Sequence, residues 1–344
     1  MEQVACLQES IDQLKFEGVQ PWLIFLDIQA AYDSVDRTLL WQSLRQSVLD
    51  PRLCDLIQNL YDRSTTKIIV VQSSVTDTIF ARAGVQQGSA LSPSLYNIHI
   101  NELASRLRSS GIGVRLHRVI LATGLYADDV GLICRNREQT ENALKICEDF
   151  SRERHFRWKS SKSKIIDPTG EECDNLTLYR QPLELVKSFK YLGVNFNKNG
   201  IDIEGLISDN IKRATKSSEI LRSLGCHLGG LHPHLIAIIY KTRIRPQLSY
   251  GLTVLSIPQP SMNRLTKAEK SILGKFFGAS YHSGPEILYA FLDSAPIQDF
   301  ISRVTAQWLS RITQAPDTTL IHHAVRAAEV IGRSSSLTRC RQDN

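Results

Sequence analysis

Three aspartates in this sequence stand at the ends of apolar segments, where a charged side chain is costly. Asp27 follows the apolar run 23–26, and the adjacent Asp128 and Asp129 separate two apolar, β-rich runs. An acid at the end of a buried strand is destabilising unless a partner neutralises it, and two adjacent carboxylates also repel each other. Mg²⁺ binds few carboxylates and completes its shell with water and substrate phosphates, so it resolves both problems. The three acids therefore predict a carboxylate site for divalent cations.

A site of three acids can hold two metal ions and support phosphoryl transfer. Asp27 lies 101 residues before Asp128, so the fold has to place the first strand beside the segment that carries the acid pair. Two metals held in this way activate the attacking oxygen and stabilise the leaving oxygen of an in-line displacement. The alternative is that the acid pair is only a polar hairpin turn, which is common for an isolated Asp-Asp.

The surrounding sequence predicts the elements that would position these acids. Residues 22–28 predict a buried strand, and residues 119–126 and 130–134 predict a hairpin with the acid pair at its tip. After Gly200 the apolar residues keep helical spacing instead. The pattern therefore indicates a mixed α/β part followed by an all-helical part, with the change near residues 197–204.

The charge of the chain is mildly basic and unevenly distributed. The 344 residues carry a formal net charge of +6. Residues 200–277 contain 11 basic and 5 acidic side chains, and residues 151–167 contain 6 and 2. Both stretches fit either a solvated basic surface or a surface that follows a polyphosphate backbone.

Composition excludes several classes of protein. No run of 18 apolar residues is present, which argues against a membrane span. The first residues show no basic leader followed by an apolar stretch, so no secretory signal is expected. Seven scattered cysteines fit reduced thiols better than a disulfide framework, and we therefore expect an intracellular protein of the nucleus or cytoplasm.

Five short segments, together and in order, resemble the catalytic blocks of a known family. They are Asp27 to Asp36, Gly84 to Ser89 with Leu91-Ser92-Pro93 after it, Tyr126 to Asp129, Lys162 to Lys164, and Tyr191 to Val194. Each segment is weak alone, but the ordered set is specific. It resembles the reverse transcriptases of non-LTR (LINE-like) retrotransposons, and the resemblance covers about residues 1 to 280.

The resemblance implies a fold, which is an α+β polymerase palm, with an antiparallel sheet and helices on one face, followed by an all-helical thumb-like domain. On this basis we expect a remnant helix of the fingers region at 1–20, a catalytic palm at 21–198, a thumb-like domain at 199–325 and a loose tail at 326–344.

The resemblance also implies an activity, RNA-directed DNA polymerisation. In this reaction the 3′-hydroxyl of a DNA primer attacks the α-phosphate of a deoxynucleoside triphosphate on an RNA template. Two Mg²⁺ ions, or Mn²⁺ in their place, would serve as cofactors.

The matching positions carry expected roles at the metal site. Asp27, Asp128 and Asp129 match the metal-binding acids, and Ile28 matches a position that offers only its backbone carbonyl to the metal. Tyr32 matches an aromatic gate at the place of a 2′-hydroxyl, where a ring would exclude ribonucleotides by steric clash. The alternative for Tyr32 is an ordinary core aromatic.

Further positions match the nucleotide-binding loop and the triphosphate. Gln87 and Gly88 match the loop over the incoming nucleotide and template, although Gly88 also fits a simple turn. Lys162 matches a lysine that donates a proton to, or stabilises the charge of, the leaving pyrophosphate, and its alternative is a solvated surface lysine. The family usually has Asn where Lys159 stands.

A later hairpin matches the segment that grips the primer end. Its residues are Tyr191, Leu192 and Gly193, and the alternative is a packed edge strand.

The chain departs from the family pattern at its start. Only 26 residues precede Asp27, whereas such polymerases carry a fingers region and often an endonuclease there. We therefore expect an N-terminally truncated fragment, whose fingers could come from an unidentified protein partner. Three alternatives stay open: a catalytically weak or inactive remnant that only binds nucleic acid, a palm polymerase of another kind such as an RNA polymerase, and a product that hardly folds.

Overall fold

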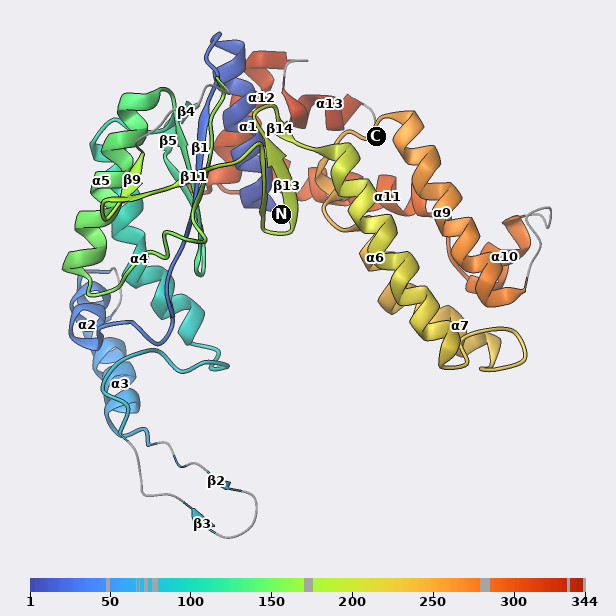
Figure 1. Ribbon diagram of the computed structural model, residues 1–344, viewed down its shortest axis with the longest axis horizontal. Helices are drawn as coiled ribbons and strands as arrows, with labels where there is room; N and C mark the ends of the chain where they lie inside the picture. The colour runs from blue at the N-terminus through green and yellow to red at the C-terminus, as the bar shows by residue number, and fades with distance from the viewer. Residues whose placement is uncertain are drawn as a thin grey trace. The chain divides into compact units, whose positions relative to one another are not determined.

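The computed structural model describes residues 1–47, 50–65, 67, 69–70, 74–75, 80–169, 176–278, 285–332 and 335–342. These residues form two compact units (Figure 1). The first, the sheet unit, comprises residues 20–114 and 120–187. The second, the helical unit, comprises residues 1–19, 115–119 and 188–344.

The sheet unit is built on a five-stranded sheet with the order β11-β8-β1-β7-β6. Its strands are β1 (Trp22–Asp27), β6 (Thr123–Tyr126), β7 (Asp129–Cys134), β8 (Lys164–Ile166) and β11 (Glu184–Leu185). Strand β1 pairs antiparallel with both β7 and β8, and β6 pairs antiparallel with β7. Strand β11 runs parallel to β8, the one parallel pair that the described residues place in this sheet. The expected hairpin of the acid pair is therefore present, as β6 and β7.

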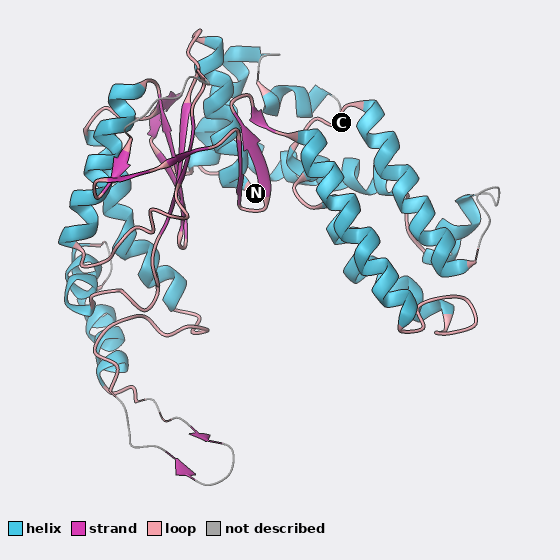
Figure 2. Ribbon diagram, viewed as in Figure 1, coloured by secondary structure: helices cyan, strands magenta, loops and turns pink. Residues whose placement is uncertain are grey.

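Helices α4 (Ser92–Ser109) and α5 (Arg137–Glu153) cover one face of this sheet (Figure 2). Helix α2 (Arg37–Gln46) packs against α4, and α3 (Pro51–Asp62) packs against α2. Side chains alternate between faces along a strand, and Trp22, Ile24 and Leu26 of β1 share one core cluster with residues of all four helices. The apolar run of β1 is thus buried except at its end, Asp27. This arrangement confirms the expected α+β architecture.

The described residues also form three pairs of short strands. They are β2 (Ile69–Val70), β3 (Ser74–Val75), β4 (Val114–Leu116), β5 (Val119–Leu121), β9 (Thr177–Leu178) and β10 (Gln181–Pro182). The pairs are β2 with β3, β4 with β5, and β9 with β10.

The helical unit contains a small sheet as well as helices. The sheet consists of β12 (Ser188–Tyr191), β13 (Val194–Asn197) and β14 (Gly200–Ile201). The helices after it are α6 (Ile203–Ser223), α7 (Pro233–Ile239), α8 (Arg245–Ser249), α9 (Gln259–Phe277), α10 (Pro285–Leu292), α11 (Ile297–Thr313), α12 (Leu320–Ile331) and α13 (Ser336–Gln342). A π-helical turn (Tyr240–Ile244) joins α7 to α8, and a 3₁₀ turn (Leu252–Val254) follows α8.

The first helix, α1 (Glu2–Phe16), belongs to the helical unit and packs against α12 and α13. The two units differ from the expected division of the chain in two places. Residues 1–19 group with the second unit, and that unit begins at Ser188 rather than at 199, so strands β12 to β14 precede its helices. A linear reading of the sequence cannot show that the first helix packs against the far end of the chain.

The expected loose tail at 326–344 is also wrong for its described residues. Helix α12 continues to Ile331 and α13 follows it, with Leu337 and Cys340 buried. The start of α13 is held by acids of α1, because Ser335 Oγ donates to Glu9 Oε2 at 2.8 Å and the Ser336 amide donates to Asp12 Oδ2 at 2.7 Å. A helix therefore begins at Ser336, within the segment expected to be a loose tail.

Across the part of the chain that the structure describes, no helix is both long enough and apolar enough to span a bilayer.

Candidate active site

The register of the central strands brings the first acid opposite the acid pair. In the antiparallel pairing of β1 with β7, Asp27 lies directly across from Asp129. Residues opposite each other in such a pair have Cα atoms about 4.5–5.5 Å apart. Asp128 precedes β7 in the two-residue turn that joins it to β6. Asp27 and Asp128 are 101 residues apart in the sequence, but the fold places them at the ends of neighbouring strands.

The turn that carries Asp128 is strained. Its first residue, Ala127, has φ of 52°, in the left-handed region that a residue with a Cβ rarely adopts. Asp128 is exposed, as is Asp129 after it. Such strain persists where surrounding structure fixes it and is common at functional sites.

The carboxylates interact electrostatically. Asp129 is exposed, but the surrounding protein removes enough water from its carboxylate to raise its pKa. The negative charges of Asp128 and Asp27 raise this pKa further, and the positive charge of Lys162 lowers it. The three acids thus form one concentration of negative charge, which a cation would relieve.

Lys162 is placed beside the first of these acids. Its Nζ lies 3.6 Å from Asp27 Oδ1, and its side chain is more than half exposed. The segment that carries it is bonded to the end of β1, because the Lys159 amide donates to the Asp27 carbonyl at 2.8 Å and the Asp27 amide donates to Ser163 Oγ at 3.3 Å. Lys162 is therefore exposed to solvent and also lies close to the acid site. This position is compatible with both predicted roles, a solvated surface lysine and a lysine that acts on the leaving pyrophosphate.

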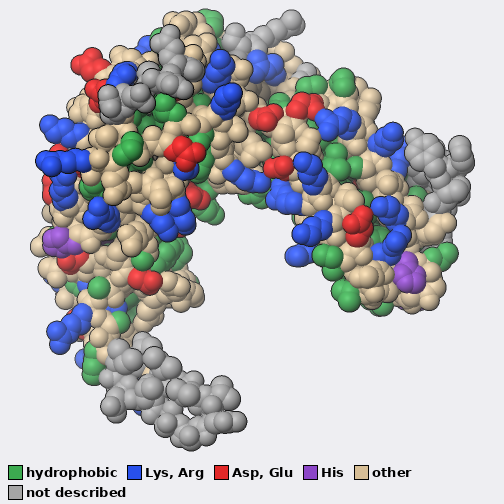
Figure 3. Space-filling model, viewed as in Figure 1, with side chains coloured by type: hydrophobic (Ala, Val, Ile, Leu, Met, Phe, Trp, Pro, Cys, Tyr) green, Lys and Arg blue, Asp and Glu red, His purple; other side chains and the backbone are tan. Residues whose placement is uncertain are grey.

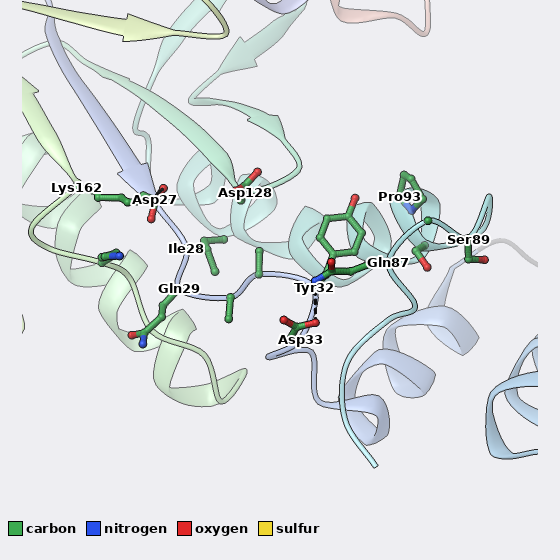
Figure 4. A pocket seen from close by; sticks show the side chains of 15 residues that line it. Asp27, Ile28, Gln29, Tyr32, Asp33, Gln87, Ser89, Pro93, Asp128 and Lys162 are labelled. Carbon is green, nitrogen blue, oxygen red and sulfur yellow. Dashed lines mark hydrogen bonds and ion pairs between the residues drawn. The ribbon is translucent and has the colours of Figure 1, made fainter. Parts of the chain in front are cut away.

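A cavity of about 600 Å³ opens beside Asp27, Asp128 and Lys162 (Figure 4). Its lining comes from three chain segments and the acid turn: residues 27–33, residues 87–89 with 92–93, Lys159 with Lys162, and Asp128. In the close-up, Asp27 lies at the end of its strand with Lys162 directed toward it. Asp129 does not line this cavity.

Tyr32 lines the cavity and also packs on the core. Its ring stacks on the ring of the buried Tyr96, with centroids 5.1 Å apart and planes 14° apart. Tyr32 itself is only half-buried. One face of the ring is therefore fixed by the core, while the side chain borders the cavity, and the predicted role as a gate stays a prediction.

The loop with Gln87 and Gly88 is fixed against the segment that carries Tyr32. The Gly84 amide donates to the Val35 carbonyl and the Val85 amide donates to the Tyr32 carbonyl, both at 2.8 Å. Gly84 has φ of 83°, and a Cβ there would lie 3.1 Å from the Tyr32 carbonyl oxygen, so only glycine fits this close approach.

The amide of Gln87 is oriented by an acid. Its Nε2 donates to Asp33 Oδ1 at 3.0 Å (Figure 4), which leaves the amide oxygen as an acceptor at the cavity. Gly88 has φ of 84° with no heavy atom within 4 Å of an added Cβ, so it is a turn residue at an open position.

The predicted primer-grip residues lie in the helical unit. Leu192 and Gly193 form the turn between β12 and β13, and the side chain of Tyr191 is buried against Phe196. The buried ring of Tyr191 agrees with the alternative of a packed strand for that side chain, while the turn itself remains half-buried.

Sequence reasoning missed several residues of the cavity. Asp33, Ser89 and Lys159 line it without having been assigned a role there. Asp33 lies within the first block and Lys159 in the basic stretch 151–167, so both had a local signal. Neither signal shows which way the side chain faces, because that depends on how two loops meet.

The donor set fits a hard divalent cation, although the side chains do not form a closed ligand cage. Within the described residues, no three His, Cys, Asp or Glu side chains are arranged as a complete metal site. Asp27, Asp128 and Asp129 offer only oxygen donors, with Lys162 as their nearby cation. Sparse carboxylate ligation completed by water and phosphate is the coordination that Mg²⁺ prefers.

Comparisons with known proteins identify the family of this chain. Residues 2–196 match the family described as Reverse transcriptase (RNA-dependent DNA polymerase). The chain is 26% identical over 298 residues to the Retrovirus-related Pol polyprotein from type-1 retrotransposable element R2 of Popillia japonica, covering 83% of this chain and 47% of that protein. It is 26% identical over 324 residues to the RNA-directed DNA polymerase from mobile element jockey of Drosophila funebris, covering 90% and 34%.

A comparison with solved structures matches apo telomerase from Candida tropicalis at 12% identity and a TM-score of 0.45, covering 98% of this chain and 50% of that one. The chain spans less than half of the length of the two retrotransposon relatives. The ordered motifs, the α+β sheet with its acid pair and the match over more than half of the residues lead to one conclusion: the chain belongs to the reverse transcriptase family, with relatives among the non-LTR retrotransposons.

Proposed function

We propose that this chain catalyses RNA-templated DNA synthesis by transfer of a deoxynucleotide to a primer 3′-hydroxyl. The observation that supports this most is the pairing of Asp27 with Asp129 at neighbouring strand ends, with Asp128 beside them and a cavity adjoining. Phosphoryl transfer needs little covalent help from a protein and depends on positioning and charge neutralisation. The cavity supports positioning of the nucleotide, and a negatively charged strand end beside it would hold the cations that neutralise the phosphate charge.

In this proposal Asp27, Asp128 and Asp129 hold two Mg²⁺ ions, with the carbonyl of Ile28 as a further ligand. When bound, these ions supply Lewis-acid stabilisation of the attacking and leaving oxygens. The position of Ile28 supports its role. Its antiparallel bridge to Trp158 uses the backbone groups of Asp27 and Gln29, so the Ile28 carbonyl is directed away from residues 157–159.

The remaining cavity residues select and position the nucleotide. Tyr32, held by its stack on Tyr96, would clash with a ribose 2′-hydroxyl and so favour deoxynucleotides. Gln87 would present its oriented amide to the nascent base pair. Lys162 would stabilise negative charge on the departing pyrophosphate, because it is the cation that lies at the edge of the acid site.

The helical unit is proposed to contact the template–primer backbone. Lys and Arg side chains gather over α6 in the space-filling view (Figure 3). The sequence of α6 includes the exposed Lys212, Arg213 and Lys216. Contacts from such residues to phosphates supply affinity and position without sequence preference. The predicted primer-grip turn at Leu192 and Gly193 belongs to the same unit.

The test is primer extension by the purified chain on an RNA template with Mg²⁺ and deoxynucleotides. We expect extension by the wild type and a fall of at least about a hundredfold for Asp128→Ala, because a metal ligand is lost. The matched control is Asp149→Asn, an exposed helical acid paired with Arg152, which should stay within about twofold of the wild type.

The alternative of a remnant that only binds nucleic acid predicts another outcome of the same experiment. The wild type would then bind the template–primer with an affinity that falls steeply with salt, yet extend it no faster than Asp128→Ala. That result would overturn the proposed activity while leaving the family membership intact.

A further inference from the structure

The turn between β12 and β13 adopts a conformation that its sequence does not favour. Tyr191 pairs with Val194, so Leu192 and Gly193 form a two-residue hairpin turn. Both have positive φ, 48° for Leu192 and 78° for Gly193. Turns of this kind favour Asn, Asp or Gly at both positions, and a leucine in the left-handed region is strained. Something outside the hairpin must hold the turn.

The side chain that holds the turn is Tyr250, 58 residues later in the chain. Its hydroxyl donates to the carbonyl oxygen of Leu192 at 2.9 Å. Its ring lies against Gly193 so closely that a Cβ on Gly193 would be 2.7 Å from Tyr250 Cε1. Position 193 therefore requires glycine for two reasons: its φ is positive, and the Tyr250 ring leaves no room for a Cβ.

Tyr250 is itself fixed by helix α6. Asn210 Nδ2 donates to the Tyr250 carbonyl at 2.8 Å and to the Leu248 carbonyl at 3.1 Å. Arg213 donates to Asn210 Oδ1 and places its guanidinium carbon 5.9 Å from the centroid of the Tyr250 ring. Helix α6 thus contacts Tyr250 at two places, its backbone carbonyl and the face of its ring. The ring lies between α6 and the turn.

We propose that Tyr250 is a positioning residue that fixes the Leu192–Gly193 turn to the helices of this unit in the geometry that receives the primer end. The inference rests on the proposed function, because the primer-binding role of this turn is part of it. Tyr250 acts through the turn: its hydroxyl is already engaged by the Leu192 carbonyl, and the ring covers Gly193. Its loss should therefore weaken primer binding and leave deoxynucleotide binding unchanged.

The experiment compares Tyr250→Phe with the wild type in two measurements. The variant keeps the ring on Gly193 and loses only the bond to Leu192. Hydrogen exchange should be faster in the peptide covering 188–197 and unchanged in the strands of the sheet unit. In primer extension, the KM for template–primer should rise by about threefold to tenfold, as for the loss of one hydrogen bond, with the KM for deoxynucleotide unchanged.

The matched control is Tyr289→Phe, which removes a hydroxyl of the same unit that donates to Glu269 Oε2 at 2.7 Å and makes no contact with the turn. This variant should lower the melting temperature but leave both the KM for template–primer and exchange in 188–197 unchanged. A Tyr250→Phe protein that matches Tyr289→Phe in these two measurements would overturn the proposal.

The outcome also separates this inference from the proposed function. If the wild type does not extend primers, the proposed activity is wrong, and hydrogen exchange alone then tests whether Tyr250 fixes the turn. Faster exchange of 188–197 in Tyr250→Phe would support this role of Tyr250, and unchanged exchange would overturn it.

Discussion

At the scale of single residues, the acid site is the part of the molecule that sequence patterns predict best. Asp27, Asp128 and Asp129 each interrupt apolar segments, and the register of β1 with β7 brings them to one end of these neighbouring strands. Asp33 and Lys159 were missed because their roles depend on how loops meet at the cavity. A charged residue at the end of a buried strand has few explanations, whereas a charged residue in a loop has many.

Tyr32 gives a prediction on substrate choice. Tyr32→Ala removes the ring that borders the cavity, so incorporation of ribonucleotides relative to deoxynucleotides should rise by about tenfold to two-hundredfold, as for other steric exclusions in binding pockets. The stack on Tyr96 is lost as well, at a cost of about 0.5–1.5 kcal/mol in the free energy of unfolding.

Tyr32→Phe is the control for this change, because it keeps the ring and its stack. Its discrimination between the two sugars should match the wild type in single-nucleotide incorporation assays. Equal discrimination by the wild type and Tyr32→Ala would show that another group excludes the ribose.

At the scale of elements, local sequence patterns predict whether a segment forms a helix or a strand, and long-range packing determines where that element lies in the fold. The strand at 22–28 and the hairpin of the acid pair were predicted from their own residues. The helix start at Ser336 was not, although Ser335 Oγ accepts from the Thr338 amide at 3.1 Å as a local N-cap. Acids of α1, more than 300 residues away in sequence, also bind this helix start, and such distant partners leave no pattern in the sequence around it.

Two glycines of one loop separate backbone strain from steric contact. Gly84 and Gly88 have nearly the same φ, 83° and 84°, but only Gly84 has backbone atoms about 3 Å from an added Cβ. Each substitution to alanine should lower the free energy of unfolding by about 1 kcal/mol through the strain of positive φ. Gly84→Ala adds a steric clash, so its total loss should be about 2–4 kcal/mol.

Chemical denaturation of the two variants measures this difference. The free energy of unfolding should fall clearly more for Gly84→Ala than for Gly88→Ala. Equal losses would mean that the loop does not approach the Tyr32 carbonyl as closely as described.

The contact between α1 and α13 should make stability depend on pH. Burial is the main cause that raises the pKa of Glu9 to about 7, and the nearby Asp12 raises it further, while its hydrogen bond from Ser335 opposes both. The folded state therefore retains a proton that the unfolded state has released. Stability is greatest below the ordinary pKa of a glutamate and falls as pH rises toward 7.

Melting temperatures at pH 5 and pH 8 test this coupling. The wild type should melt at a lower temperature at pH 8, and Glu9→Gln, which cannot ionise, should reduce the difference between the two values. A wild-type protein that becomes more stable from pH 5 to pH 8, with Glu9→Gln showing the same trend, would contradict the assignment.

At the scale of the whole molecule, the units are not contiguous in sequence. Residues 1–19 join residues 188–344, and the sheet unit lies between them in the chain. The change to helical spacing of apolar residues near residue 200 predicted two parts, and its position is close to the observed boundary at Ser188. It could not show that the first helix crosses to the other unit, since the packing partners of α1 are at the far end of the chain.

The most direct test of the account is addition of a single deoxynucleotide to a primer on an RNA template, measured with Mg²⁺ for the wild type and for Asp27→Asn. Asp27 comes from a strand distant in sequence from the acid pair, so its effect tests the convergence of the three acids and the activity together. The account predicts addition by the wild type and a loss of at least about a hundredfold for the variant. Equal rates of addition by the two proteins would contradict it.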